Sequence, residues 1–139
     1  MDRDADHAEI WRRSAEAFNR TFTEATDDYF EFLDEEVEWV PITSRLDGVT
    51  YRGRNAVRNW MADLRRDWEI YEVTWEELRD LDEDRLLAIG SWHARGRRSG
   101  VELHLQQAAW LHHFRNRKII RMQTFTDRSA ALEAAGLRE

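Results

Sequence analysis

The sequence has 139 residues, 42% of them hydrophobic and 35% charged, and carries a formal net charge of −7. With only six glycines and one proline, this composition excludes a collagen, a low-complexity disordered chain and a coiled coil. The acidic balance disfavours a nucleic-acid partner, and no apolar run approaches the ~18 residues that a membrane-spanning helix needs.

Three helices are predicted in the first half of the chain, at residues 6–23, 25–33 and 54–68. The first and third carry apolar side chains at the three- and four-residue spacing of one helix face. The short second segment has two aspartates near its start, which suit the positive end of a helix dipole. The apolar stripes consist of Trp11, Ala15, Phe18 and Phe22 in the first helix and Val57, Trp60, Met61, Leu64 and Trp68 in the third.

A short strand and a loop are predicted between the second and third helices. Residues 35–40 alternate between apolar and polar and end at Pro41, which is typical of an edge strand. Residues 43–51 have the composition of a loop, and Asp47 followed by Gly48 is a turn signal within it.

The second half of the chain changes to the two-residue period of strands. Helices followed by a meander of long strands indicate an α+β fold, within one domain that spans residues 1–139. We expect three N-terminal helices packed on a strongly curved antiparallel sheet, a cone-shaped pocket between them and a short C-terminal helix. The expected strands are residues 70–81, 86–95, 101–114 and 119–126, and the closing helix is residues 129–135 with Asp127 as its N-cap.

The loop at residues 96–100 predicts the register of the central hairpin. An even-numbered loop pairs Arg95 with Glu102 and His93 with His104 on one face of the hairpin. The other face is almost wholly apolar and is assigned to the core and pocket, whereas a bulge or an odd-numbered loop would exchange the two faces. The register then continues with the pairs Ser91–Gln106, Trp92–Leu105, Gly90–Gln107, Ala88–Ala109 and Leu86–Leu111.

The half-polar face of the hairpin is predicted to contact a second copy of the chain. Beyond the histidines this face carries Leu87, Ile89, Ala108 and Trp110, an apolar patch with a polar rim. Such a patch suits a subunit interface, so we expect a homodimer through the outer face of the sheet.

His93 and His104 are candidate catalytic residues, because imidazole titrates near neutrality and is the commonest general acid–base group. The predicted register points both away from the pocket, which favours a solvent or interface role. With Glu102 they could also form a metal face of two histidines and one carboxylate. No other feature of the sequence supports a metal, and none is expected.

Asp127 is the third catalytic candidate, as a carboxylate at the pocket end of the last strand or, more simply, as a helix cap. His112 and His113 are a weaker pair, because adjacent residues of a strand point to opposite faces. The sequence contains no phosphate-binding glycine loop, nucleophile elbow or zinc-binding histidine motif.

Four local patterns together resemble the SnoaL-like branch of the nuclear-transport-factor-two-like superfamily, over about residues 10–137. The resemblance implies a cone-shaped pocket between a bent sheet and three helices, usually in a homodimer. The patterns are Val37-Glu38-Trp39-Val40, Tyr51-Arg52-Gly53-Arg54, residues 95–102 at the hairpin tip, and Asp127-Arg128 leading to residues 131–137.

The catalytic residues of known members are mostly replaced in this chain. Where a ketosteroid isomerase has its tyrosine, aspartate base and protonated aspartate, our alignment puts Ser14, Trp39 and Ala109. The last-strand aspartate of a limonene-epoxide-hydrolase-like relay falls near Thr124, and a polyketide cyclase would have only Asp127 available. A dehydratase of the scytalone type would have to recruit one of the two outward-facing histidines.

The resemblance and the composition together predict a domain that binds a small, mostly apolar, aromatic or polycyclic molecule in the cone. If the protein is an enzyme, cofactor-free isomerase, dehydratase or cyclase chemistry is implied; the alternative is a non-catalytic dimeric domain with a filled or vestigial pocket. The absence of cysteine and the acidic N-terminus favour the cytoplasm. The expected ligand-binding residues are Ser14, Trp39, Tyr51, Trp60, Trp92, Leu105, Gln107, Ala109, Met122 and Thr124.

Overall fold

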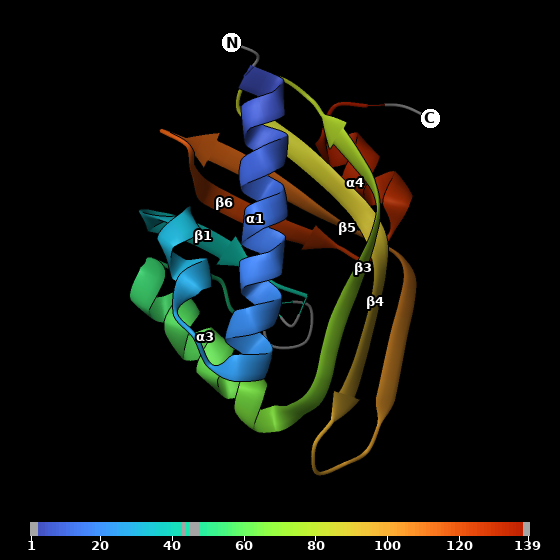
Figure 1. Cartoon of the computed structure of the whole chain (residues 1–139). Coiled ribbons are helices and arrows are strands. Elements are labelled where there is room, and N and C mark those ends of the chain that lie inside the picture. Colours follow the sequence, from blue (N-terminus) through green and yellow to red (C-terminus); the bar gives the residue numbers. More distant parts are fainter. Residues whose placement is uncertain (1–2, 43, 45–47, 138–139) are drawn as a thin grey trace.

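Six strands form a single curved sheet, with helices on both of its faces (Figure 1). The computed structural model describes residues 3–42, 44 and 48–137. The strand order is β2-β1-β6-β5-β4-β3, and all neighbouring pairs are antiparallel except β1 and β6. The strands are β1 (Leu33–Val40), β2 (Tyr51–Arg52), β3 (Trp68–Asp80), β4 (Arg85–Gly96), β5 (Glu102–Arg115) and β6 (Lys118–Phe125).

Helices α1 and α3 form close to where the apolar stripes predict them, whereas the second predicted helix is one short 3-10 helix. Ala25 has a positive φ of 61° and Leu33 is already extended, so these two residues bound the segment, and Asp28–Phe32 between them forms the 3-10 helix. No helix in the described part of the chain is long and apolar enough to cross a bilayer. The helical segments are α1 (Arg3–Glu24), η1 (Asp28–Phe32), α3 (Arg54–Asp67) and α4 (Arg128–Ala134).

The prediction of an edge strand at residues 35–40 is wrong, because β1 lies inside the sheet. Its outer side pairs with β2, with Trp39 opposite Tyr51, and its inner side runs parallel to β6. The sequence pattern predicts a loop at Tyr51, which leaves β1 without this neighbour. Asp47 of the expected turn lies outside the described residues.

Two apolar clusters lie on the two faces of the sheet. The larger one is enclosed by α1, η1, α3 and the concave face, and α1 crosses in front of that face in Figure 1. The smaller one joins the convex face to α4 and contains Leu87, Ile89 and Leu132. Because α4 covers Leu87 and Ile89, and Ala108 and Trp110 are buried in the larger cluster, the predicted dimer patch is wrong in its residues.

The central hairpin keeps the predicted register only in its half near the tip. Arg95 pairs with Glu102, His93 with His104 and Trp92 with Leu105, as expected. A bulge then follows, so that the next pairs are Gly90–Ala108, Ala88–Trp110 and Leu86–His112. The predicted pairs Gly90–Gln107, Ala88–Ala109 and Leu86–Leu111 are therefore wrong, and past the bulge the residues of β5 exchange faces.

The bend of the sheet is concentrated at Gly90. A second irregularity lies between Trp75 and Glu77 on β3, directly across from Gly90 and on the opposite side of β4 from the first bulge. The backbones approach so closely here that a Cβ at Gly90 would overlap the carbonyl oxygen of Thr74. Bulges increase the local twist of a sheet. Two of them, on β3 and on β5 at either side of Gly90, explain why β3, β4 and β5 curl around the helices.

Candidate functional site

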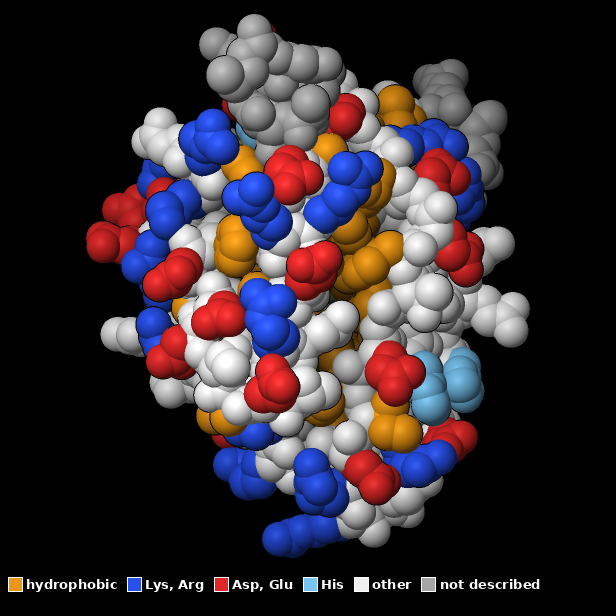
Figure 2. Space-filling model, viewed as in Figure 1, with side chains coloured by type: hydrophobic (Ala, Val, Ile, Leu, Met, Phe, Trp, Pro, Cys, Tyr) orange, Lys and Arg blue, Asp and Glu red, His pale blue; other side chains and the backbone are white. Residues whose placement is uncertain are grey.

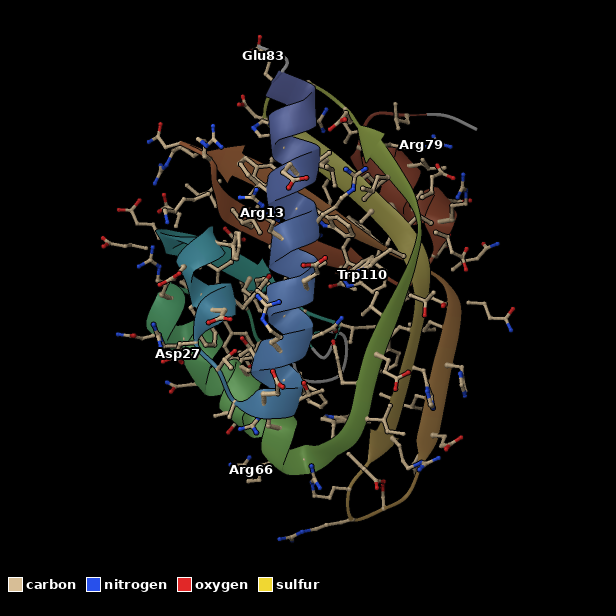
Figure 3. All side chains as sticks on the ribbon, in the orientation of Figure 1. Arg13, Asp27, Arg66, Arg79, Glu83 and Trp110 are labelled. Carbon is tan, nitrogen blue, oxygen red and sulfur yellow. The ribbon has the colours of Figure 1, made fainter. Side chains whose placement is uncertain are left out.

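A pocket lies inside the cone, between α1 and the concave face of the sheet. The half-buried side chains of its lining all come from α1 and β3, namely Ala15, Phe18, Val73 and Trp75, whereas the other lining side chains are buried. The pocket therefore opens between α1 and β3. Figure 2 shows hydrophobic side chains recessed along this seam, and Figure 3 shows Trp110 behind it.

Aromatic rings make most of the pocket wall and fall into two groups. In the first group, Trp75 meets Trp11 and Trp110 edge to face, each with ring centroids 4.7 Å apart. His112 extends this group, with its ring edge-on to Trp11 at 6.4 Å. The second group consists of Phe18, Tyr29, Trp39, Trp60 and Tyr71, in contact at centroid distances of 5.2–6.3 Å.

The space between these rings is small. The cavity has a volume of about 40 Å³, room for about three water molecules. A bicyclic ligand needs more than this, so one of the half-buried rings at the mouth must turn aside to admit it. Phe18 and Trp75 are the rings placed to do so.

Two buried polar atoms in the pocket have no hydrogen-bond partner among the described residues: Nε1 of Trp39 and Nδ1 of His112. The two aliphatic hydroxyl groups of the lining are already engaged, since Ser14 Oγ donates to the Trp11 carbonyl at 2.7 Å and Thr124 Oγ1 to the sulfur of Met122 at 3.4 Å. Leaving a buried polar group unpaired is costly. The Nε1 group of Trp39 and the Nδ1 atom of His112 are therefore available to hydrogen-bond a ligand in the pocket.

The pocket holds its ionisable groups in their neutral forms. Burial lowers the pKa of His112 to about 4, against a smaller opposing effect of a backbone hydrogen bond at Trp110. Burial also raises the pKa of Tyr29 and of Tyr71 well above the usual value. At neutral pH the site therefore offers an uncharged imidazole and two protonated phenols.

Five of the ten predicted ligand-binding residues line this pocket: Ser14, Trp39, Trp60, Met122 and Thr124. Tyr51, Trp92 and Leu105 belong to the surrounding core instead. The remaining two predicted residues, Gln107 and Ala109, are displaced by the bulge in β5. It leaves Gln107 exposed and turns Ala109 to the convex face against α4. These two residues were placed in the pocket by the unbroken register, and that placement is wrong.

The three predicted catalytic residues lie outside the pocket. His93 and His104 project from the convex face, as the register of the tip predicted. Asp127 is the N-cap of α4, and its carboxylate accepts hydrogen bonds from the backbone amides of Ser129 and Ala130. The capping interpretation of Asp127 is the one its hydrogen bonds match.

His112 lines the pocket, although the sequence analysis ranks it with His113 as a weaker pair of candidates. In an unbroken strand it would share the outward face with His104, eight residues earlier. The signal for the bulge is the pair Gln106–Gln107, two consecutive polar residues inside an otherwise alternating apolar strand.

Comparisons of fold and sequence place the chain among proteins with this architecture. An NTF2-like protein from Burkholderia thailandensis superposes with a TM-score of 0.72 at 21% identity, covering 95% of this chain and 98% of that one. A putative polyketide cyclase from Xanthomonas campestris has a TM-score of 0.67 at 18% identity, with 88% and 91% covered. TerC, co-crystallised with polyporic acid, has a TM-score of 0.71 at 19% identity, with 94% and 98% covered.

At these identities the similarity establishes the fold alone. Among curated proteins, none matches the chain in sequence. The profile of the SnoaL-like domain, however, matches residues 11–122, which is most of the chain. The protein therefore belongs to the SnoaL-like family of the nuclear-transport-factor-two-like superfamily, as its sequence patterns predicted.

Proposed function

We propose that this protein binds a small, flat, mostly apolar molecule in the pocket between α1 and the sheet. The observation that carries the proposal is the pair of unpartnered buried nitrogens, Trp39 Nε1 and His112 Nδ1, in a wall that is otherwise mostly apolar. Ligand pockets combine such an apolar lining with a few polar groups that fix orientation. The indole N–H donates a hydrogen bond, and a neutral imidazole nitrogen accepts or donates one.

The wall favours an aromatic ligand over an aliphatic one. Edge-to-face contacts with rings such as Trp11, Trp75 and Trp110 add to the free energy of burial by about 0.5–1.5 kcal/mol per pair. A carbonyl or phenol oxygen on the ligand would meet the Trp39 N–H. The crystallisation of TerC with polyporic acid, an organic molecule, is consistent with a ligand of this kind in a similar fold.

A second function, cofactor-free proton transfer, is favoured by the position of His112. An imidazole that lines the pocket can take a proton from a bound ligand, and the phenols of Tyr29 and Tyr71 can stabilise the oxyanion that results. Structural neighbours described as a putative polyketide cyclase and a putative isomerase fit this class. A pKa near 4 makes His112 a weak base, however, so we place binding first.

A bicyclic aromatic ketone, 2-tetralone, tests both functions with one probe. Its binding should quench tryptophan fluorescence, because the pocket contains five of the seven tryptophans. We expect at least 10-fold weaker binding in His112→Phe, which keeps an aromatic ring, and in Trp39→Phe, which removes the N–H. Trp68→Phe, outside the pocket lining, serves as the matched control and should bind like the wild type.

Proton transfer is measured with the same ketone in D₂O, by following the loss of its α-proton signal in NMR spectra. The wild type should accelerate exchange and His112→Phe should not, since the α-proton passes to Nδ1 and deuterium returns from it. Binding of 2-tetralone without faster exchange of its α-proton would show that the protein binds the ketone but does not catalyse proton transfer. Failure of the wild type to bind 2-tetralone and other bicyclic aromatics would favour the non-catalytic dimeric domain with a filled pocket.

A further inference from the structure

A second group of titratable side chains lies on the convex face of the sheet, near the tip of the β4–β5 hairpin. His93 on β4 stands directly opposite His104 on β5, and Arg95 stands opposite Glu102 in the next pair on the same face. The two imidazole rings stack with centroids 4.2 Å apart and planes 3° from parallel. Figure 2 shows histidine side chains gathered over this part of the hairpin, beside an acidic side chain.

Three potential metal ligands converge in this group. One nitrogen of His93, one nitrogen of His104 and one carboxylate oxygen of Glu102 all lie within 4.8 Å of one another. Two ligands at zinc-bond lengths of ~2.0–2.1 Å in a tetrahedral site are about 3.3 Å apart. Rotation of the exposed His104 and Glu102 side chains can close this difference, which is at most about 1.5 Å.

The hydrogen bonds around the group leave ligand atoms available. Nε2 of His93 is buried and has no partner among the described residues. Arg95 directs both its Nε and Nη2 groups to the same oxygen of Glu102, Oε1, and therefore leaves Oε2 free.

The surrounding charges favour a cation. Glu72 of β3 is paired with His93 across the strands and shares its face, and Glu69 of the same strand forms an ion pair with Arg95. The three carboxylates of Glu69, Glu72 and Glu102 thus lie near the two imidazoles and outnumber the guanidinium of Arg95, with which two of them are paired.

We propose that His93, His104 and Glu102 form a binding site for a divalent transition-metal ion of the zinc type. Two imidazoles and one carboxylate suit Zn²⁺ or Co²⁺, and with three protein ligands the ion keeps one position for water. This proposal departs from the sequence expectation of no metal. The sequence places the three residues on one face, but only the structure brings their ligand atoms together and shows that Nε2 of His93 is buried without a hydrogen-bond partner among the described residues.

The site is independent of the pocket described above. His112, which lines the pocket, lies on the opposite face of β5, eight residues beyond His104. A metal bound at the convex face would therefore not require any ligand in the cone, and the two proposals succeed or fail separately.

Isothermal titration calorimetry with ZnCl₂ on the chelator-treated protein tests the site. We expect one Zn²⁺ per chain at neutral pH. His104→Asn and Glu102→Gln should each weaken binding at least 10-fold. Both side chains are exposed, so these variants should keep the wild-type circular dichroism spectrum.

His113→Asn is the matched control, because it removes a histidine from the same strand outside the group, and it should bind like the wild type. Absorption spectra of the Co²⁺-loaded protein give a second readout, since three-ligand tetrahedral coordination produces intense visible bands that His104→Asn should lose. Equal binding by the wild type and His104→Asn would overturn the proposal. So would a stoichiometry of one ion per two chains, which would place the metal between copies.

Discussion

Two of the three histidines of strand β5 lie in opposite surroundings. His104 is exposed on the convex face and stacks against His93, whereas His112 is 5% exposed and lines the pocket on the concave face. Their separation of eight residues would put both on the same face of a regular strand. The bulge at Gln106 and Gln107 lies between them and turns the second half of the strand over.

This difference shows how one extra residue decides which chemistry a face of the sheet can perform. The tip half of the hairpin presents polar, solvent-accessible groups on its convex face. The base half hides its convex face under α4 and turns Trp110 and His112 into the cone. A paired, exposed imidazole suits metal ligation, whereas an isolated, desolvated imidazole suits hydrogen bonding to an uncharged ligand.

The largest effect is expected where the two halves meet, at Gly90. In Gly90→Ala the new methyl group would overlap the backbone of Thr74, so β3 and β4 would have to separate. We expect a loss of about 3 kcal/mol or more in the free energy of unfolding, measured by urea denaturation. Weakened 2-tetralone binding should accompany it, because the bend of the sheet shapes the pocket.

Gly100→Ala, in the hairpin loop, is the matched control for Gly90→Ala. Gly100 has a positive φ of 69° but open space around it, so its alanine variant should lose only about 1 kcal/mol through backbone strain. Equal losses in the two variants would mean that the close approach at Gly90 contributes nothing beyond the cost of replacing a glycine.

The surroundings of His112 predict a specific dependence of stability on pH. The pKa of His112 is lowered from 6.5 to about 4 in the folded chain, so below pH 6.5 the unfolded chain takes up a proton that the folded chain does not. Stability is therefore lost as the pH falls from 6.5 to about 4, by roughly 3 kcal/mol in total.

The variant His112→Phe isolates this contribution, because it keeps an aromatic ring and removes the titrating group. Unfolding free energies of the wild type and His112→Phe, measured from pH 7.5 to 4, should diverge by that amount as the pH falls. Met122→Leu, in the same pocket, should follow the wild type. A constant difference between wild type and His112→Phe would show that the imidazole is hydrated rather than buried.

Much of the architecture could be predicted from local patterns. The apolar stripe of α3 and the alternation in β3 to β6 lie close to the observed elements, and the loop at residues 96–100 predicted the pairing of His93 with His104. The neighbours of β1 could not be predicted in this way, since the two-residue strand β2 has too few residues to carry a period.

The candidate site was predictable only where no bulge intervened. Trp39, Trp60 and Met122 lie on regular elements, and all three line the pocket. Ala109 and His112 exchange faces because a bulge is a tertiary feature, favoured by the tight contact of β3 and β4 at Gly90. The consecutive Gln106 and Gln107 are consistent with a bulge but do not specify its position.

The smallest effect on stability is expected at α4, the helix that covers the convex face at the base half of the hairpin. Asp127 caps α4 by accepting from the amides of Ser129, at 2.7 Å, and Ala130, at 3.3 Å. Asp127→Ala should lower the free energy of unfolding by about 1 kcal/mol, and Asp127→Asn, which can still accept, should lose much less. If the cap keeps α4 packed over Leu87 and Ile89, amide hydrogen exchange in Asp127→Ala should become faster in α4 before it becomes faster in β4. Unchanged hydrogen exchange in α4 would show instead that the apolar contacts of Leu132 hold the helix in place. In that case α4 would still cover the base half of the hairpin without the Asp127 cap.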